Sequence, residues 1–445
     1  MSAVWSRTTQ RGDDGALRIG GCDVRDLAGE FGTPLYVVDE EDFRARARAF
    51  VDDFSAAFAR YDAQVDVYYA GKAFLCSQVA QWMREDGLGV DVASQGEMET
   101  ALRGGVPADR LALHGNNKSD DELRRALEVG VGHIVVDSFT EIEELALIAK
   151  DLGVSAPVMV RVTTGVHAGG HEYIATSHED QKFGLSLTSG AAMEALQRCH
   201  ASEDLTLLGI HTHIGSQILS VDAFAQSAAR MLQLRADFTS ATGAELPEVD
   251  LGGGYAIAYT PDGEALDTSV AATAIADAVN EIVTTTGGTW PRFSIEPGRA
   301  IAGPAGSTLY RVGVVKNVEL EDGGQRQYVA VDGGMSDHMR TILYRAEYTA
   351  TIASRLSSAE PAASRVVGKH CESGDVVVRD VDLPHDIARG DLLSVPATGA
   401  YGRSMSNNYN AVPRPAVVAV RDGRARVIVR RDTLEDLLRA DVAPA

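Results

Sequence analysis

The sequence predicts an α/β protein with a parallel (β/α)₈, TIM-like barrel and a second, β-rich domain. From about residue 65, runs rich in β-branched and aromatic residues alternate with amphipathic helical stretches, and about eight such β units occur before residue 300. After about residue 304 the β-rich runs continue, but the long helical patterns between them stop. The first pattern indicates the barrel and the second indicates a separate β domain.

The expected barrel strands cover residues 65–70, 88–94, 110–116, 133–138, 157–164, 205–214, 248–254 and 292–298. Helical patterns lie between them, for example at 77–86, 119–130, 139–153 and 223–238. A doubly wound open sheet is the alternative fold, because the pattern of one sequence does not fix how many strands pair or whether the sheet closes.

The expected strands of the β-rich domain cover residues 308–320, 326–332, 364–370, 375–383, 391–397 and 416–429. Two strand-like pieces, 16–21 and 33–39, precede the barrel, and we expect them to pair with these C-terminal strands. The resulting boundaries are 41–304 for the barrel, and 1–40 with 305–445 for the β-rich domain.

Composition excludes several classes of protein. The formal net charge of −22 comes without a basic stripe, which argues against nucleic-acid binding. No apolar run approaches the length of a membrane span, and the N-terminus lacks the pattern of a secretory signal. The four cysteines, Cys22, Cys76, Cys199 and Cys371, form no CxxC pair and show no disulfide-like spacing, which fits a reducing compartment. We therefore expect a cytoplasmic protein.

Residues at the carboxyl ends of barrel strands are the candidates for chemistry. Lys72 follows the first strand and could form a Schiff base, although most such lysines are solvated charges. His211 and His213 follow the sixth strand, on one face of it. The seventh ends in Gly252–Gly254, where backbone N–H groups can face an anion. The eighth ends in Glu296-Pro297-Gly298-Arg299, which could also be a local ion pair.

This set of groups suits pyridoxal phosphate. The aldehyde of that cofactor needs an amine such as Lys72, its phosphate needs Gly252–Gly254 with Ser216, and its protonated ring nitrogen needs an anion such as Glu296. A barrel zinc hydrolase that uses His211 and His213 is an alternative, with only the scattered His167 and His171 as further histidine ligands. A cofactor-binding regulator without catalysis is another alternative. We assign no metal, because zinc binding would leave the glycine run and the lysine without a role.

The chain resembles the fold-type III pyridoxal-phosphate-dependent decarboxylases, and within them the diaminopimelate decarboxylase family. The resemblance runs nearly from end to end, through YYAGKAF, LGVDVASQGE, HTHIGSQI, VDLGGGY, EPGRAIAG, VDGGMSDHMRTILY, CESGD and TGAYGRSMSNNYN. Each motif alone is modest, but their order over this length is specific. The resemblance implies decarboxylation of meso-2,6-diaminopimelate to L-lysine and CO₂, the last step of lysine biosynthesis.

The resemblance also implies a role for individual residues. Lys72 would hold the cofactor, His213 would stack on its ring, Ser216 and Gly254 would contact its phosphate, Glu296 would pair with its ring nitrogen, and Tyr401 would reach phosphate and substrate. Arg299, Arg340 and Tyr344 would contact substrate carboxylates, Cys371 would return a proton, and Glu372 would bind the distal amino group. The family implies that Cys371 and Glu372 come from the partner in a homodimer.

The residues themselves fit a substrate with an amino-acid group at both ends, because Glu372 can pair with a distal ammonium while Arg340 and Tyr344 hold a distal carboxylate. Decarboxylation of ornithine or arginine is the alternative within this class. Two departures from the family pattern are Thr341-Ile342 after Arg340, expected to loosen that turn, and Asn407 in SNNYN. The stretch IATSHEDQKFG also differs slightly, at Ser177 and Gln181, and receives no role.

Overall fold

The computed structural model describes residues 2–166, 182–286 and 288–442. The chain forms two compact units. The first, here called the barrel unit, comprises Arg46–Ala256 and Ala265–Gly298. The second, here called the β-rich unit, comprises Met1–Ala45, Ile257–Glu264 and Arg299–Ala445. His167, His171, Ser177 and Gln181 lie outside the described residues.

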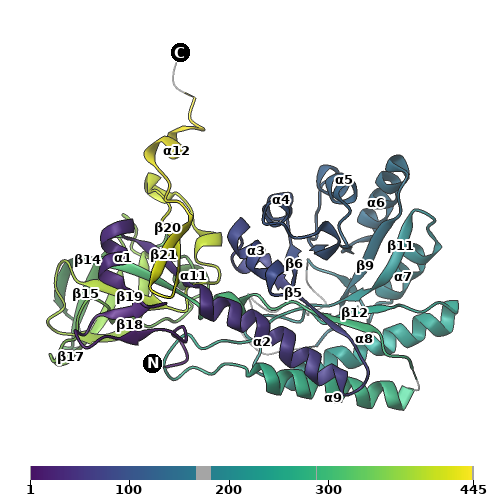
Figure 1. Cartoon of the computed structure of the whole chain (residues 1–445), viewed down its shortest axis with the longest axis horizontal. Coiled ribbons are helices and arrows are strands. Elements are labelled where there is room, and N and C mark those ends of the chain that lie inside the picture. Colours follow the sequence, from purple (N-terminus) through teal and green to yellow (C-terminus); the bar gives the residue numbers. More distant parts are fainter. Residues whose placement is uncertain (1, 167–181, 287, 443–445) are drawn as a thin grey trace. The chain divides into compact units, whose positions relative to one another are not determined.

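Eight parallel strands close into a barrel, because β8 pairs with β9 as well as with β7 (Figure 1). They are β5 (Val65–Ala70), β6 (Gly89–Val92), β7 (Leu111–Leu113), β8 (His133–Val136), β9 (Ala156–Thr163), β11 (Leu205–His211), β12 (Glu248–Asp250) and β13 (Arg292–Ile295). The short β10 (Leu185–Ser186) pairs beside β9. Each predicted barrel strand region overlaps one of the eight strands, so the barrel is confirmed and the open-sheet alternative is wrong.

Helices precede or connect the strands of the barrel. They are α2 (Glu40–Ala59), α3 (Ser77–Glu85), α4 (Gln95–Arg103), α5 (Asp120–Val129), α6 (Phe139–Leu152), α7 (Ala191–Ala201), α8 (Val221–Thr242) and α9 (Thr268–Thr286). Three of them begin with a serine cap: the side chains of Ser94, Ser119 and Ser138 accept a hydrogen bond from the backbone N–H three residues on. These caps start each helix within a few residues of the preceding strand, which fixes the strand ends.

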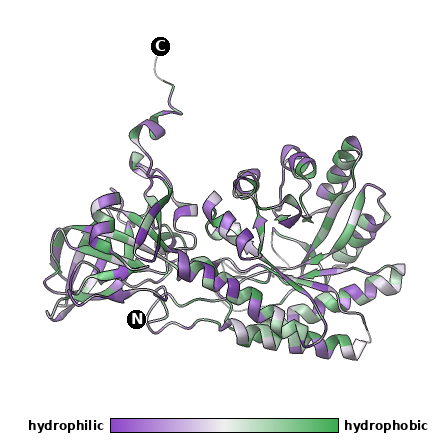
Figure 2. Cartoon of the chain, in the orientation of Figure 1, coloured by the Kyte–Doolittle hydropathy of each residue, from purple (hydrophilic) through white to green (hydrophobic). Residues whose placement is uncertain are grey.

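Burial explains why the barrel strands are so apolar. A parallel strand is covered by helices on one face and by the barrel interior on the other, so both faces lose water. Strand β5 is buried at its last four residues, and all of β6 is buried. The strands are correspondingly largely hydrophobic, whereas the helices carry both hydrophobic and hydrophilic residues (Figure 2).

The β-rich unit contains a sheet in the order β18-β17-β15-β14-β4-β20-β21, with β19 pairing β14 and β16. Its strands are β4 (Leu35–Asp39), β14 (Gly306–Glu319), β15 (Gln325–Val331), β16 (Thr351–Ile352), β17 (Pro361–Val367), β18 (Val376–Pro384), β19 (Leu392–Pro396), β20 (Ala416–Arg421) and β21 (Arg424–Val429). The N-terminal strand β4 lies between β14 and β20. The expected pairing with the C-terminal strands is therefore confirmed for 33–39. It is wrong for 16–21, because Leu17–Ile19 pairs instead with Gln10–Arg11 and Cys22–Asp23.

Smaller elements complete the β-rich unit. They are the sheet of β1 (Gln10–Arg11), β2 (Leu17–Ile19) and β3 (Cys22–Asp23), and the helices α1 (Val24–Phe31), α10 (Arg299–Ala302), α11 (Arg340–Leu343) and α12 (Leu434–Leu438). Two clusters of buried apolar side chains form the core of the unit, one including Leu17, Val37 and Val418, the other Tyr310, Val329 and Val395. Within the described residues, no helix combines the length and the apolar character that a membrane span needs.

Candidate active site

Lys72 lies at the carboxyl end of β5, in the 3₁₀ turn η1 (Gly71–Ala73), with its side chain exposed. The glycine before it is required by packing, because a Cβ at Gly71 would come 2.8 Å from the carbonyl oxygen of Asp91 at the end of the neighbouring strand. Gly298, after β13, is equally confined: a Cβ there would come 2.8 Å from the Cβ of Ala70. Lys72 therefore offers an exposed amine from a tightly packed backbone at the barrel mouth.

Glu296 is a buried carboxylate at the end of β13, and two imidazoles hold it. The Nε2 atom of His114 lies 2.9 Å from Glu296 Oε1, and the Nε2 atom of His211 lies 3.3 Å from Oε2. The rings of His114 and His211 meet edge to face, with their centroids 4.8 Å apart. Asp91 Oδ1 lies 3.7 Å from the same His114 nitrogen. Four strand ends thus contribute to one buried charged cluster.

The charges in this cluster favour an ionised Glu296. Burial alone would raise the pKa of Glu296, but His114 and His211 hold it well below its usual range. Burial would lower the pKa of His114, but Asp91 and Glu296 raise it above its usual value. His211 differs, since burial lowers its pKa to about 4 and leaves it neutral near pH 7. The cluster therefore presents a buried anion whose main counter-charge is His114.

Sequence reasoning missed His114 and Asp91. The signal was available, because His114 directly follows β7 and Asp91 interrupts the apolar strand β6, and polar residues at such positions face a barrel mouth. Asp250, at the end of β12, was also missed. Burial raises its pKa well above the usual range, with Glu296 adding to the effect.

Each glycine of Gly252–Gly254 is required by close backbone contacts. A Cβ at Gly252 would come 2.3 Å from Thr212 O, one at Gly253 would come 2.2 Å from Glu296 O, and one at Gly254 would come 2.5 Å from Gly215 O. Gly252 and Gly254 also have positive φ angles of 68° and 117°. The strand ends β11, β12 and β13 can approach one another this closely only without side chains.

Two of the three glycine N–H groups, which were expected to face an anion, donate to protein side chains instead. Gly252 N–H donates to Asp250 Oδ1 at 2.7 Å, and Gly253 N–H donates to His213 Nδ1 at 3.2 Å. Among the described residues, Gly254 N–H has no hydrogen-bond partner. Ser216 lies in the facing loop, which is joined to Gly254 by a hydrogen bond from Ile218 N–H to Gly254 O at 2.9 Å. Gly254 and Ser216 thus remain as phosphate candidates.

His213 is oriented by this glycine loop. Because Nδ1 accepts a hydrogen bond from Gly253, the neutral ring carries its proton on Nε2. Burial, with a further effect of the Lys72 charge, lowers the pKa of His213 well below its usual range. A neutral, half-buried, flat ring at the barrel mouth is suited to stack on a ligand ring.

The alternative of a zinc site built on His211 and His213 is not supported by the described residues. The group with donor atoms within 4.8 Å of one another is His114, His211 and Glu296, and it does not include His213. Metal binding would require His114 to lose its proton, whereas its acidic neighbours raise its pKa. The cluster is therefore better described as an ion pair than as a metal site.

In the β-rich unit, Arg299, Arg340 and Tyr401 gather around Tyr259. The Arg299 guanidinium lies 4.7 Å from the centre of the Tyr401 ring, and Arg299 donates a hydrogen bond to the Tyr259 hydroxyl. The Arg340 guanidinium lies 4.8 Å from the Tyr259 ring centre. Burial would raise the pKa of Tyr259, but both guanidiniums lower it below its ordinary value. Two buried cations at one aromatic group form a strong anion site.

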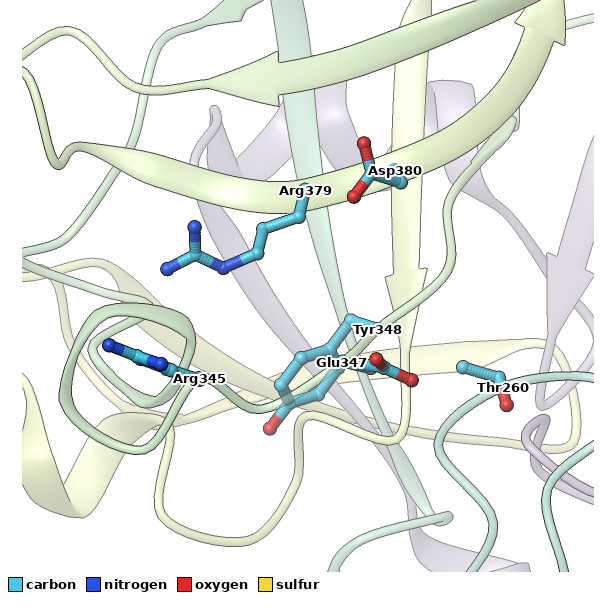
Figure 3. A pocket seen from close by; sticks show the side chains of 6 residues that line it. All are labelled: Thr260, Arg345, Glu347, Tyr348, Arg379 and Asp380. Atoms are coloured by element: carbon cyan, nitrogen blue, oxygen red, sulfur yellow. The ribbon is translucent and has the colours of Figure 1, made fainter.

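Arg340 is fixed by a second tyrosine that the sequence did not single out. Its Nη1 donates to the Tyr348 hydroxyl at 2.7 Å, and burial raises the pKa of Tyr348 to about 12. Tyr348 also lines a pocket of about 560 Å³ within the same unit (Figure 3). The lining residues are Thr260, Arg345, Glu347, Tyr348, Arg379 and Asp380. Charged groups of both signs thus surround the aromatic ring that supports Arg340.

Other predicted site residues stand apart from this group. Cys371 and Glu372 are exposed, and Glu372 Oε1 only accepts weak local hydrogen bonds from Ser373 and Gly374 at 3.4 Å. Tyr344 is half-buried and follows Arg340 by one helical turn, with its N–H donating to Arg340 O at 3.0 Å. The structure therefore brings Arg299, Arg340 and Tyr401 together and places Tyr344 next to Arg340 along α11, whereas Cys371 and Glu372 remain exposed.

Thr341, which was expected to loosen the turn after Arg340, has a defined place in the structure. Thr341 is buried, and its hydroxyl donates to Val377 O on β18 at 2.9 Å, which ties α11 to the sheet. Asn407 is also well fixed. Its N–H donates to Ser336 O, and its Oδ1 accepts from the N–H of Tyr409 at 2.8 Å. Both departures from the family pattern are accommodated by hydrogen bonds.

These residues fit pyridoxal phosphate. An exposed lysine supplies the amine, and Gly254 N–H and Ser216 supply donors for a phosphate. Glu296 Oε1 and His114 Nε2 lie close together, but the angles between them are not those of a hydrogen bond. Within the described residues, neither of these two buried atoms has a hydrogen-bond partner. A protonated ring nitrogen would satisfy the buried carboxylate oxygen.

Comparison with known proteins agrees with this chemistry. Residues 42–303 match the family described as pyridoxal-dependent decarboxylase, pyridoxal binding domain. Diaminopimelate decarboxylase of Mycobacterium tuberculosis is 50% identical over 99% of this chain and 98% of that protein. The Bacillus subtilis enzyme of that name is 44% identical over 98% of this chain and 97% of its own length.

A solved structure gives the same result. The diaminopimelate decarboxylase of M. jannaschii, in complex with L-lysine, superposes with a TM-score of 0.89 at 31% identity, covering 99% of this chain and 98% of that chain. Sequence identity, coverage and fold therefore agree, and the chain belongs to the diaminopimelate decarboxylases of the pyridoxal-dependent decarboxylase family.

Proposed function

We propose that this chain removes one carboxylate of meso-2,6-diaminopimelate to give L-lysine and CO₂, with pyridoxal phosphate as its cofactor. The buried Glu296 anion, held by His114 and His211 in the same ring of strand ends as the exposed Lys72, carries the proposal. The names of the relatives and the lysine bound in a similar solved structure support the substrate. Incubation with cofactor and meso-diaminopimelate, followed by measurement of lysine, tests the proposal.

In this proposal the residues of the barrel unit hold the cofactor. When bound, pyridoxal phosphate supplies an aldehyde for an amine and a protonated ring that accepts the electron pair left by CO₂. Lys72 is the amine that binds the aldehyde. Glu296 keeps a proton on the ring nitrogen, because an anion beside a cationic acid favours its protonated form. Ser216 and Gly254 bind the phosphate, Gly252 and Gly253 shape that loop, and His213 stacks on the ring.

Residues of the β-rich unit would bind the substrate. Diaminopimelate carries an ammonium and a carboxylate at both ends, so its recognition needs cations and an anion. Arg299, Arg340 and Tyr344 supply donors for carboxylates, with Tyr401 beside Arg299. Pro297 and Gly298 connect Arg299 to β13, and Pro297 O accepts a hydrogen bond from Ala70 N–H at 3.2 Å. Glu372 binds the distal ammonium, and Arg340 and Tyr344 bind the distal carboxylate. Ornithine and arginine lack that carboxylate, which favours diaminopimelate over them.

Cys371 is the proposed proton donor. After CO₂ leaves, one proton must return to Cα on one face, and a positioned thiol can give that proton and regain one from water. Cys371 and Glu372 are exposed, and the hydrogen bonds of the Glu372 side chain go to its neighbours Ser373 and Gly374. This exposure supports a homodimer in which each chain lends both residues to its partner's site.

Subunit mixing tests the shared site. Lys72→Ala and Cys371→Ala should each be inactive alone, but a mixed dimer has one site with both defects and one with neither. Because half of the dimers are mixed after full exchange, activity should recover to about a quarter of the wild-type value. No recovery after exchange shown by native mass spectrometry would reject the shared site, and an active Cys371→Ala parent would reject the thiol as donor.

We also infer that the enzyme works in the cytoplasm. Cys22, Cys76 and Cys199 are buried free thiols and Cys371 is an exposed one, and free thiols persist in a reducing compartment.

A further inference from the structure

Three segments of the β-rich unit carry the residues that the proposed function assigns to the substrate side. Residues 333–340 end in Arg340, residues 368–375 contain Cys371 and Glu372, and residues 401–411 begin with Tyr401. His370 belongs to the segment 368–375, and its side chain contacts both 333–340 and 401–411. Its Nε2 is 2.8 Å from Ser336 Oγ, and its Nδ1 is 3.0 Å from Asn410 Oδ1. The side chain is buried, with 8% of the residue exposed.

Both ring nitrogens of His370 have defined roles. Asn410 Oδ1 can only accept, so Nδ1 carries the proton and donates it to Asn410. In the neutral imidazole Nε2 then accepts a hydrogen bond from the Ser336 hydroxyl. The ring also packs at 5.4 Å, centre to centre, against the ring of Tyr409. The imidazole therefore bridges two segments in opposite directions, which an aliphatic side chain could not do.

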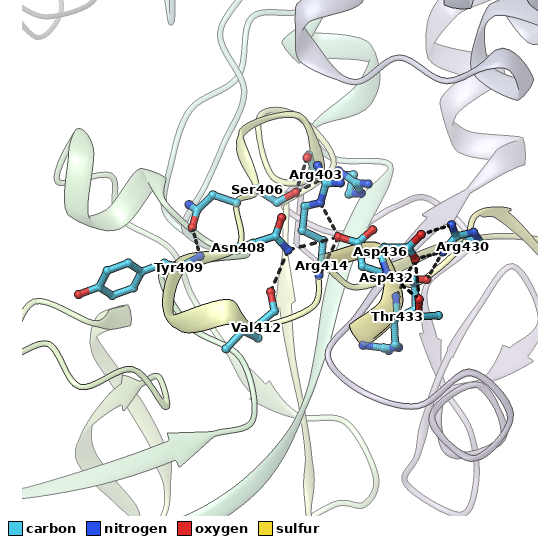
Figure 4. Close-up of polar contacts among 12 residues, drawn as sticks. Arg403, Ser406, Asn408, Tyr409, Val412, Arg414, Arg430, Asp432, Thr433 and Asp436 are labelled. Carbon is cyan, nitrogen blue, oxygen red and sulfur yellow. Dashed lines mark hydrogen bonds and ion pairs between the residues drawn. The ribbon is translucent and has the colours of Figure 1, made fainter. Parts of the chain in front are cut away.

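The segment around Asn410 is firm enough to serve as an anchor. Asn408 Nδ2 donates to Val412 O at 3.0 Å and to Asp432 Oδ2 at 3.3 Å (Figure 4). Arg414 Nε donates to the same Asp432 oxygen at 2.7 Å. Asn410 itself has a positive φ of 53°, a conformation that asparagine tolerates better than most residues. These contacts tie the segment after Tyr401 to the C-terminal strand region.

The backbone next to His370 forms the turn that presents Cys371. His370 N–H donates to Asp375 Oδ2 at 2.7 Å, and Met335 N–H donates to Asp375 Oδ1 at 2.6 Å. Glu372 N–H donates to His370 O at 2.8 Å, which closes a three-residue turn around Cys371. The thiol itself has no hydrogen-bond partner in the described part of the chain. Its direction is therefore set by the residues on either side of it.

We propose that His370 is a positioning residue that holds the turn of Cys371 and Glu372 in register with the segments of Arg340 and Tyr401. The proposal rests on the proposed function for the catalytic and binding roles of these residues. The effect on structure does not depend on that function: removal of the His370 bridge should change the exposure and the direction of the Cys371 thiol. A displacement of about 1 Å at a reacting group is enough to lower turnover by as much as 100-fold.

Three variants of His370 separate the two hydrogen bonds. His370→Ala removes both, His370→Asn can still donate to Asn410, and His370→Gln can still accept from Ser336. His385→Ala is the matched control, since His385 is an exposed histidine of the same unit without a side-chain contact to the described residues. All four are prepared as holoenzymes, and their cofactor absorbance and Tm are compared with those of the wild type.

The first measurement is the rate at which iodoacetamide alkylates Cys371. Cys371 is the exposed thiol and the other three are buried, so peptide mass spectrometry can follow it in the native enzyme. We expect the rate for His370→Ala to change at least about fivefold, those for His370→Asn and His370→Gln to change less, and that for His385→Ala to equal the wild-type rate.

The second measurement is the division between kcat and KM for decarboxylation. We expect His370→Ala to lower kcat by about tenfold or more, with partial recovery in His370→Asn or His370→Gln and unchanged cofactor content. Wild-type alkylation and wild-type kcat in all three His370 variants would overturn the proposal. So would a lower Tm accompanied by an unchanged alkylation rate, which would make His370 a purely structural residue.

The proposal and the function can fail separately. If the wild-type enzyme makes no lysine, the proposed function fails, while the alkylation rates still decide whether His370 positions the thiol. If His370→Ala does not fold, His370→Asn and His370→Gln provide the same comparison.

Discussion

The Nε2 atom of His114 lies 2.9 Å from Oε1 of Glu296, with both side chains buried at the carboxyl ends of barrel strands. Another Glu–His pair, Glu248 with His133 at 2.7 Å, connects strands β12 and β8 at their amino-terminal ends. Of these two pairs, His114–Glu296 lies where barrel enzymes place their chemistry and His133–Glu248 does not.

These two pairs give a matched comparison. Glu296→Gln should lower kcat by about 100-fold or more, because a neutral amide cannot stabilise a protonated ring nitrogen as an anion does. Glu248→Gln should lower Tm while kcat stays within about twofold of wild type. Steady-state kinetics and cofactor absorbance of both variants test this. Equal losses of kcat in the two variants would contradict the assignment of Glu296.

Arg340 should decide which substrate is used. Arg340→Gln should lower kcat/KM for meso-diaminopimelate by about 100-fold, because the distal carboxylate loses its charged partner, and should affect ornithine much less, since ornithine has no such carboxylate. Wild-type enzyme should use ornithine, arginine and lysine far more slowly. Arg311→Gln, an exposed arginine on β14, is the control. An unchanged preference in Arg340→Gln would refute this role.

Stability should depend on pH through Asp337. Burial raises the pKa of Asp337 to about 7 in the folded state, although Tyr310 and the Gly334 N–H donate to its carboxylate. Because the folded pKa exceeds the unfolded one, the stabilising effect is fully present below about pH 4 and is lost as pH rises through 7. Asp337→Asn cannot ionise and should escape that loss.

Chemical unfolding of wild type and Asp337→Asn between pH 4 and 8 measures the effect. The free energy of unfolding of the wild type, relative to that of the variant, should fall with pH by at most about 4 kcal/mol. Parallel curves for the two proteins would show that Asp337 does not titrate in this range.

Patterns along the chain predicted the barrel well, since β-rich runs alternate with amphipathic helical stretches about eight times. They also indicated the strand-end residues Lys72, His213 and Glu296, because a barrel exposes such positions at one face. The contacts that support these groups were not predictable. His114 acts through Glu296, a partner more than 180 residues away, and Asp91 acts through His114 on the next strand, which no local pattern can reveal.

The segment 257–264 shows the same limit in the β-rich unit. It lies within the region that the sequence assigned to the barrel, yet it packs with the β-rich unit and brings Tyr259 to Arg299 and Arg340. A single aromatic residue in a loop has no periodicity, so its packing depends on tertiary contacts alone. Likewise, the role of the glycines in letting strand ends approach became clear only from their backbone contacts.

The most direct test of the account is decarboxylation of meso-diaminopimelate by the pure enzyme with pyridoxal phosphate, compared with Lys72→Ala. The wild type should release L-lysine and CO₂ in equal amounts, and borohydride should fix the cofactor to the peptide that contains Lys72. Lys72→Ala should make no lysine. Absence of lysine from the wild type, or wild-type turnover in Lys72→Ala with cofactor added, would contradict the account.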